Sequence, residues 1–175
     1  MSTTALVARA VGKNDINEAW VTSLRACTLA LFFGLTITAF HNPISQLALT
    51  LIAPPSGVEE ASTRYLDIRL MGAPLTLLNF VISGYLIATG ETKKLLALQL
   101  LLNASNAILN IILAKFLALG ITGIALGTVI AEALTVAAAA HIIYQKYRNS
   151  TNQHGSSSQL TVSYTHLTLP TICSV

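Results

Sequence analysis

The sequence predicts an all-α membrane protein, a bundle of four transmembrane helices with one short helix at the membrane surface. Composition is the first observation: 53% of the 175 residues are hydrophobic and 10% are charged, whereas soluble domains carry about 25% charged residues. Second, four apolar stretches are long enough to cross roughly 30 Å of hydrocarbon. Third, one of these stretches carries four carboxamides on a single face.

The four expected spans make up residues 18–148, and residues 1–17 precede them as a cytoplasmic connection. Gly90 and the polar residues after it separate the second span from the third, and Gly120 marks the turn before the fourth. Prolines interrupt the stretch between the first two spans, which therefore predicts only a short interfacial helix. The spans are expected near residues 18–40, 65–89, 95–119 and 121–144.

Basic residues predict the orientation of these spans, because cytoplasmic loops of membrane proteins are enriched in Lys and Arg. Six basic loop residues fall on one side of the expected membrane: Arg9, Lys13, Lys93, Lys94, Lys146 and Arg148. We therefore expect a multi-pass membrane protein with both ends of the chain in the cytoplasm.

The C-terminal residues differ in composition from the spans. Residues 149–161 are polar and Ser-rich, which is typical of a linker. Residues 162–175 resemble a translated sequencing adapter, so we expect this tail to be an artefact and the chain to be a fragment. The alternative is a genuine β-prone tail.

Gln99, Asn103, Asn106 and Asn110 lie in the third span. At about 100° per residue, offsets of 4, 7 and 11 place all four carboxamides within roughly 40° of Gln99 on one helix face. An unpaired amide in hydrocarbon costs roughly 2–7 kcal/mol, so this stripe must face polar groups or water. Interhelical bonding is one interpretation, with each amide contributing roughly 0.6–2 kcal/mol. Four amides on one stripe favour the lining of a cavity.

Glu132 is the carboxylate that lies well inside an apolar span. Intramembrane ionisable groups tend to be functional, so Glu132 is expected either to exchange protons or to be a structural carboxyl bonded to a neighbouring span. Gly123, Gly127 and Ala131 form a ridge of small residues that favours close helix packing. The sequence shows neither a nucleophile–base pair nor a metal-ligand cluster, so it predicts no enzyme, no cofactor and no nucleic-acid partner.

The order of these residues resembles the multidrug and toxic compound extrusion (MATE) family, and within it the DinF-like branch. Several motifs carry the resemblance: Tyr65-x-x-Ile68-Arg69-x-x-x-x-Pro74, Gly84, Asn103-x-x-Asn106-x-x-x-Asn110 and Gly123-x-x-x-Gly127-Thr128-x-Ile130-Ala131-Glu132. The resemblance implies twelve helices in two lobes, of which the four spans correspond to helices three to six. Helices one and two and the C-terminal lobe are then missing partners of the same polypeptide.

The resemblance also implies a function and a site. The chain is expected to be a fragment of an efflux antiporter of the bacterial inner membrane. This antiporter would alternate its access, couple to protons or sodium, and export small organic substrates across the lipid bilayer. Its cation-linked site would comprise Tyr65, Asn106, Asn110 and Thr128. Gln99, Asn103 and Glu132 are expected as further cavity lining.

One position departs from the family pattern, because the family commonly has Asp where this chain has Asn110. An amide carries no proton at physiological pH, so protonation would rest on a carboxylate of the missing first helix or on Glu132. Two alternatives to the antiporter remain open. One is a lipid-precursor flippase of the same superfamily, and the other is a stand-alone four-helix accessory protein of the membrane.

Overall fold

A computed structural model describes residues 2–13, 15–55 and 57–157. In that part, the chain forms seven α-helices and one π-helix. The chain divides into two compact units, residues 1–139 and 140–175. The first unit holds the helical bundle with all of the expected site residues, and the second holds the C-terminal part of the last helix.

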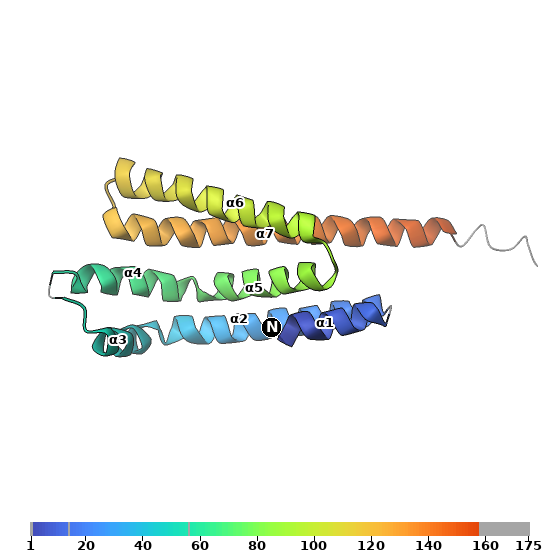
Figure 1. Cartoon of the computed structure of the whole chain (residues 1–175), viewed down its shortest axis with the longest axis horizontal. Helices are drawn as coiled ribbons and strands as arrows, with labels where there is room; N and C mark the ends of the chain where they lie inside the picture. Colours follow the sequence, from blue (N-terminus) through green and yellow to red (C-terminus); the bar gives the residue numbers. More distant parts are fainter. Residues whose placement is uncertain (1, 14, 56, 158–175) are drawn as a thin grey trace, which may run out of the picture. The chain divides into compact units, whose positions relative to one another are not determined.

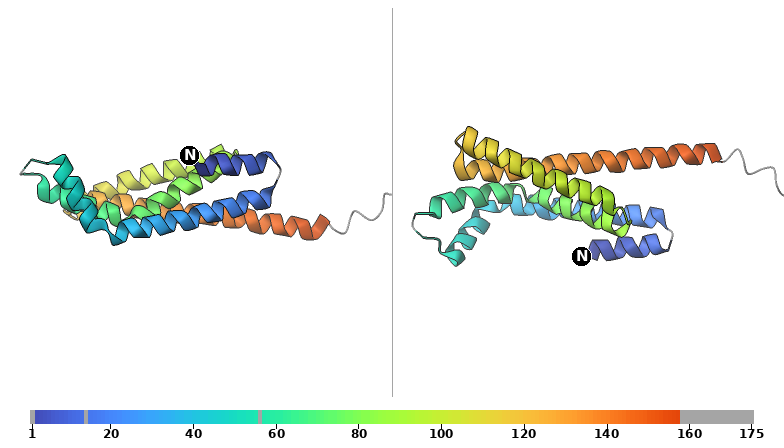
Figure 2. Two further views of the ribbon diagram at one scale, coloured as in Figure 1. Left: turned by 90° about the horizontal axis from the view of Figure 1, so that it is seen from below. Right: turned by 45° about the horizontal axis from the view of Figure 1, so that its top comes forward.

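The first two helices form an antiparallel hairpin. Helix α1 (Ser2–Gly12) folds back along α2 (Ile16–Ala39), as Figure 2 shows in blue. Asp15 begins α2, because its side chain accepts a hydrogen bond of 2.8 Å from the backbone N–H of Glu18. Most of the expected connection at residues 1–17 is therefore helical. It is anchored by a small buried cluster of Val7, Ala10 and Ala19 with Tyr85 and Ala88.

Helix α3 (His41–Ile52) lies crosswise to α2 (Figure 1). Its 12 residues are too few to span a bilayer. Pro43 lies in its first turn, where the missing N–H of proline costs no helical hydrogen bond. The helix ends at Ala53, whose φ of 46° is left-handed. The short helix predicted between the first two spans is thus present.

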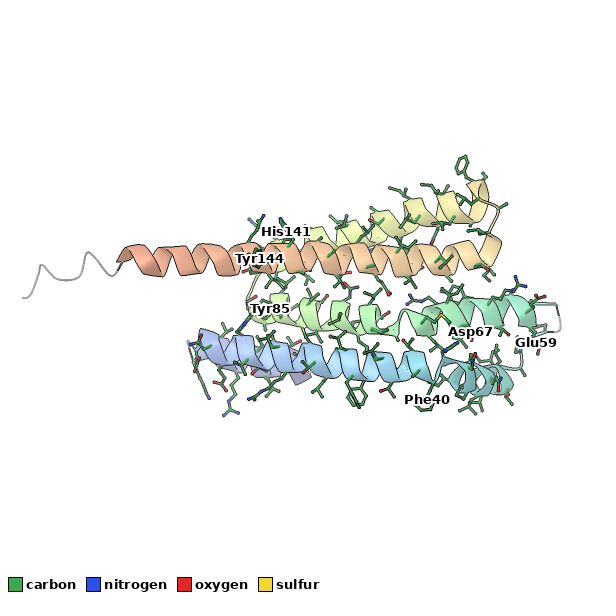
Figure 3. The ribbon with its side chains drawn as sticks, turned by 180° about the vertical axis from the view of Figure 1, so that it is seen from behind. Phe40, Glu59, Asp67, Tyr85, His141 and Tyr144 are labelled. Atoms are coloured by element: carbon green, nitrogen blue, oxygen red, sulfur yellow. The ribbon has the colours of Figure 1, made fainter. Side chains whose placement is uncertain are left out.

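The second span is broken. Helix α4 (Glu59–Met71) and helix α5 (Ala73–Ala88) meet at Gly72 with a bend of 54°. Figure 3 labels Glu59 and Asp67 on α4 and Tyr85 near the far end of α5. Pro74 lies in the first turn of α5 and has no N–H to continue the hydrogen-bond ladder, which explains the position of the break.

The third span is α6 (Thr92–Asn110), which continues as the π-helix η1 (Ile111–Phe116). The turns before and after this span contain Gly90 at φ 72° and Gly120 at φ 56°, conformations that favour glycine. Helix α7 (Gly120–Ser157) follows. A polar linker is expected from residue 149, but α7 continues into that stretch as far as Ser157. The remaining linker residues and the adapter-like tail lie outside the described residues.

Three helical segments of the described chain are long and apolar enough to cross a membrane, at Asn17–Ala39, Thr92–Phe116 and Gly120–Gln145. The bent pair α4–α5 is a fourth if it is counted as one span. The prediction of a four-span helical bundle is therefore confirmed.

Glycines let the helices of the first unit approach closely around the break. A β-carbon added at Gly34 of α2 would lie 2.5 Å from Cα of Pro74. One added at Gly72 would lie 2.7 Å from Val129 of α7. One added at Gly123 would lie 2.7 Å from the carbonyl carbon of Leu113 in η1. The break is thus held between α2 and α7, and α7 packs in turn on η1, as the predicted ridge of small residues requires.

Candidate functional site

The carboxamides of α6 are partly satisfied by one another and by their own helix. Asn110 Nδ2 donates to Asn106 Oδ1 over 2.6 Å. Asn103 Nδ2 donates to the backbone oxygen of Gln99 over 2.8 Å, and Gln99 Nε2 donates to Ser83 Oγ of α5 over 3.4 Å. Asn103 is exposed, whereas the other three side chains are half-buried. The stripe therefore lies along the edge of the packed face of α6.

Asn110 lies at the most constrained point of this edge. Its side-chain oxygen directly contacts the place that a β-carbon at Gly127 would take, and its backbone nitrogen is 3.2 Å from that place. Asn110 Oδ1 is buried and accepts no hydrogen bond from any described residue. The π-helix begins at the next residue, and π segments frequently occur at functional sites. A buried acceptor without a donor is costly, so this oxygen is suited to accept a proton donor or a cation.

Thr128 follows Gly127 on α7, and Gly127 is the residue that packs against Asn110. Its hydroxyl donates to the backbone oxygen of Ile124 over 3.0 Å, which leaves the hydroxyl oxygen free to accept. Tyr65 is half-buried on α4 and takes no part in the hydrogen bonds of Asn106, Asn110 and Thr128. The structure thus pairs Asn106 with Asn110 and packs Asn110 on Gly127, the residue before Thr128, and it leaves Tyr65 on a separate helix.

Glu132 belongs to a second polar cluster, which we call the Glu132 cluster: Arg69, Thr76, Asn79 and Glu132. Arg69 Nη2 donates to Glu132 Oε1 over 3.1 Å, and Thr76 Oγ1 donates to Glu132 Oε2 over 2.8 Å. Asn79 Nδ2 donates to the backbone oxygen of Glu132 over 3.3 Å. The side chains of Arg69 and Glu132 are 23% and 9% exposed. The carboxyl is therefore bonded to neighbouring helices, the structural alternative that the sequence left open.

Two features of this cluster were not predicted from the sequence. Arg69, near the end of a span, turns inward and pairs with Glu132. The sequence also predicts no site for Thr76 and Asn79, or for Ser83, which lies further along α5 and accepts from Gln99. Their offsets of 3 and 7 place them on one helix face, so the periodicity that identified the α6 carboxamides would also have found them.

These observations define a class of protein: a multi-pass helical membrane protein whose polar side chains meet one another inside the bundle. The chain belongs to the MatE family, whose model matches residues 1–114. Over 136 residues it is 35% identical to DNA damage-inducible protein F of Escherichia coli (strain K12). The match covers 78% of this chain and 30% of that relative, so the chain spans less than a third of the relative's length.

Solved structures agree with this assignment. An outward-facing conformation of a multidrug resistance MATE family transporter of the MOP superfamily matches with a TM-score of 0.76 and 25% identity, over 83% of this chain and 32% of that one. An inward-facing conformation of such a transporter matches with a TM-score of 0.73 and 25% identity, over 79% and 32%. A MOP superfamily transporter from Pyrococcus furiosus shares the fold, with a TM-score of 0.76 at 24% identity over 82% and 32%. The resemblance to DinF-like MATE proteins is confirmed.

Proposed function

We propose that this chain is part of the N-terminal lobe of an efflux antiporter that couples export of small organic molecules to entry of protons or sodium. Membership of the MatE family and the likeness to both inward- and outward-facing transporters support this proposal. The observation that carries it is the Asn106–Asn110 pair beside Gly127, with a buried amide oxygen that lacks a donor.

The remaining parts of the protein are also proposed. Since the chain spans 30% of its curated relative, we infer that two preceding helices and a second lobe of the same polypeptide complete the transporter. The basic loop residues support an orientation with both ends of this segment in the cytoplasm, and the likeness to a protein of Escherichia coli supports a bacterial inner membrane as its location. The site residues on α6 and α7 would then face the missing helices.

The coupling site would use Asn106, Asn110, Thr128 and Tyr65. The amide and hydroxyl oxygens of the first three are neutral acceptors, which suit a hard cation such as sodium or a protonated carboxyl from a missing helix. Glu132 is already engaged by Arg69 and Thr76, which favours a structural part for it over proton exchange.

The proposal is tested with the full-length protein in proteoliposomes, with ethidium as the probe. We expect a proton or sodium gradient to drive ethidium transport, and the gradient that succeeds identifies the coupling ion. Transbilayer movement of a fluorescent phospholipid without ethidium transport would favour the flippase. Absence of both activities would contradict the antiporter and the flippase alike.

Asn110→Asp is expected to increase proton-driven ethidium export several-fold in the full-length protein. The new carboxylate would lie beside Asn106 and Gly127, where it can bind and release a proton that the amide cannot. The measurement is the initial export rate under a fixed pH gradient. Asn103→Asp is the matched control, because Asn103 is exposed and bonds its own helix. An unchanged rate for Asn110→Asp, or an equal gain for both variants, would contradict the assignment.

Asn103→Cys is expected to react with a small cationic thiol reagent that does not enter lipid, because the polar edge of α6 faces water. Leu101→Cys is the matched control: Leu101 is also exposed on α6, but it lies on the apolar face, so lipid should protect it. Both are made in full-length protein with Cys27 replaced by alanine. If both cysteines are protected in inward- and outward-facing states, the four carboxamides serve interhelical bonding alone and line no cavity.

A further inference from the structure

A single carboxylate bridges the break in the second span. Glu132 Oε1 accepts from Arg69, three residues before Gly72, and Glu132 Oε2 accepts from Thr76, four residues after it. We propose that Glu132 is a positioning residue that clamps the bend between α4 and α5. This inference rests on the proposed function, since the bend would set where Tyr65 lies relative to the coupling site.

The backbone alone does not fix this bend. Pro74 has no N–H, and the hydrogen bonds around Gly72 close only local turns, such as Gly72 N–H to Ile68 O at 3.1 Å and Leu75 N–H to Gly72 O at 3.0 Å. The carbonyl oxygens of Leu70 and Met71 both lie 3.3 Å from the hydroxyl of Thr38 on α2. Side chains therefore hold the break on two sides, Thr38 from α2 and Glu132 from α7.

The geometry of the Glu132 carboxylate restricts how α4 and α5 can rotate against each other. A carboxylate presents two oxygens in a fixed plane, and here each oxygen takes a donor from a different side of the break. Because Glu132 is almost fully buried and Arg69 mostly so, water competes weakly for these bonds. Rotation of α5 against α4 would have to stretch one of the two bonds.

The clamp lies one turn from the proposed coupling residues. Tyr65 precedes Arg69 by four residues on α4, and Thr128 precedes Glu132 by four residues on α7. Helix α4 and the first part of α7 run in the same direction (Figure 1), so both residues lie on the same side of the clamp. A change in the bend would thus move Tyr65 relative to Thr128 and to the Gly127–Asn110 contact.

The experiment measures the bend directly, by electron paramagnetic resonance distances in full-length protein in liposomes. Spin labels are placed at Glu60→Cys on α4 and Ile87→Cys on α5, both exposed, with Cys27 replaced by alanine. For a rise of about 1.5 Å per residue, full straightening of the 54° bend would lengthen this distance by about 4 Å. We expect Thr76→Val to lengthen the distance between the two labels or to broaden its distribution. Glu132→Gln should have a larger effect of the same kind.

Thr135→Val is the matched control, because Thr135 is a buried threonine of α7 whose hydroxyl bonds the Ala131 carbonyl of its own helix. It should leave the distance unchanged. Thr76→Ser retains the hydroxyl and should restore the unmodified distance, which loss of packing alone would not predict. Wild-type distances in both Thr76→Val and Glu132→Gln would overturn the clamp.

Transport provides an independent outcome. Thr76→Val is expected to lower the maximal rate of ethidium export several-fold with little change in KM, because no site residue is altered. The distance measurement requires no transport, so absence of export by the wild-type protein would refute the proposed function while the clamp is still tested. Normal export with an altered distance would overturn the link between the bend and the site.

Discussion

Glu132→Ala is expected to lower the free energy of unfolding of the full-length protein by about 3–5 kcal/mol, since it leaves a buried guanidinium unpaired. Arg69 donates to Glu132 over 3.1 Å, and its Nη1 atom has no acceptor among the described residues. The hydroxyl of Thr76 would lose its carboxylate acceptor as well. Unfolding by SDS in mixed detergent micelles measures the difference.

Two controls separate this effect from general damage. Glu60→Ala removes a surface ion pair with Arg64 at 2.6 Å, whose side chains are 81% and 64% exposed, and should cost at most about 1 kcal/mol. The double variant Arg69→Met, Glu132→Met should recover most of the loss, because apolar residues of similar volume often replace a buried pair without penalty. If Glu132→Ala lowers the free energy of unfolding as little as Glu60→Ala does, the Arg69–Glu132 pair is well hydrated.

Gly34→Ala is expected to be the most damaging glycine substitution at the break, with a loss of about 1–3 kcal/mol from overpacking. The added methyl would lie 2.5 Å from Cα and 2.8 Å from N of Pro74. These are backbone atoms, so relief requires movement of α2 or of α5. This cost outweighs the gain of up to about 1 kcal/mol in helix propensity. The same micelle unfolding assay applies.

Gly12→Ala is the matched control, because an added β-carbon meets nothing within 4 Å at that helical position. Its stability should be unchanged or slightly higher. Equal stabilities for Gly34→Ala and Gly12→Ala would contradict the close approach of α2 to the break.

The positions of the helices could be predicted because they follow from local physics. Hydrophobic length identifies the spans, Pro74 lacks the donor that a continuous helix needs, and Gly90 and Gly120 supply left-handed turns. The expected end of the fourth span, at residue 144, agrees with the apolar part of α7, which ends at Gln145, although the helix itself continues to Ser157. The four carboxamides share a face for the same local reason, the period of 3.6 residues.

The partners of the polar residues could not be predicted in this way. Nothing in the sequence near Arg69 indicates its partner, which the packing of α7 supplies by bringing Glu132 within 3.1 Å of it. Similarly, the four carboxamides were treated as one stripe, yet Asn110 pairs with Asn106 while Gln99 reaches Ser83 of the preceding helix. Side chains 56 and 63 residues apart in sequence meet in the Glu132 cluster, and no local rule encodes such distances.

By itself, the sequence determined that this protein is a helical membrane protein with four spans, a short helix between the first two and a polar edge on the third. Each of these properties depends on residues within a turn or a span of one another. Only the tertiary structure decided that Glu132 holds both sides of the break and that Asn110 lies against Gly127. Those contacts depend on how closely glycines let separate helices approach, and burial in a medium without water then favours bonds between polar groups of neighbouring helices.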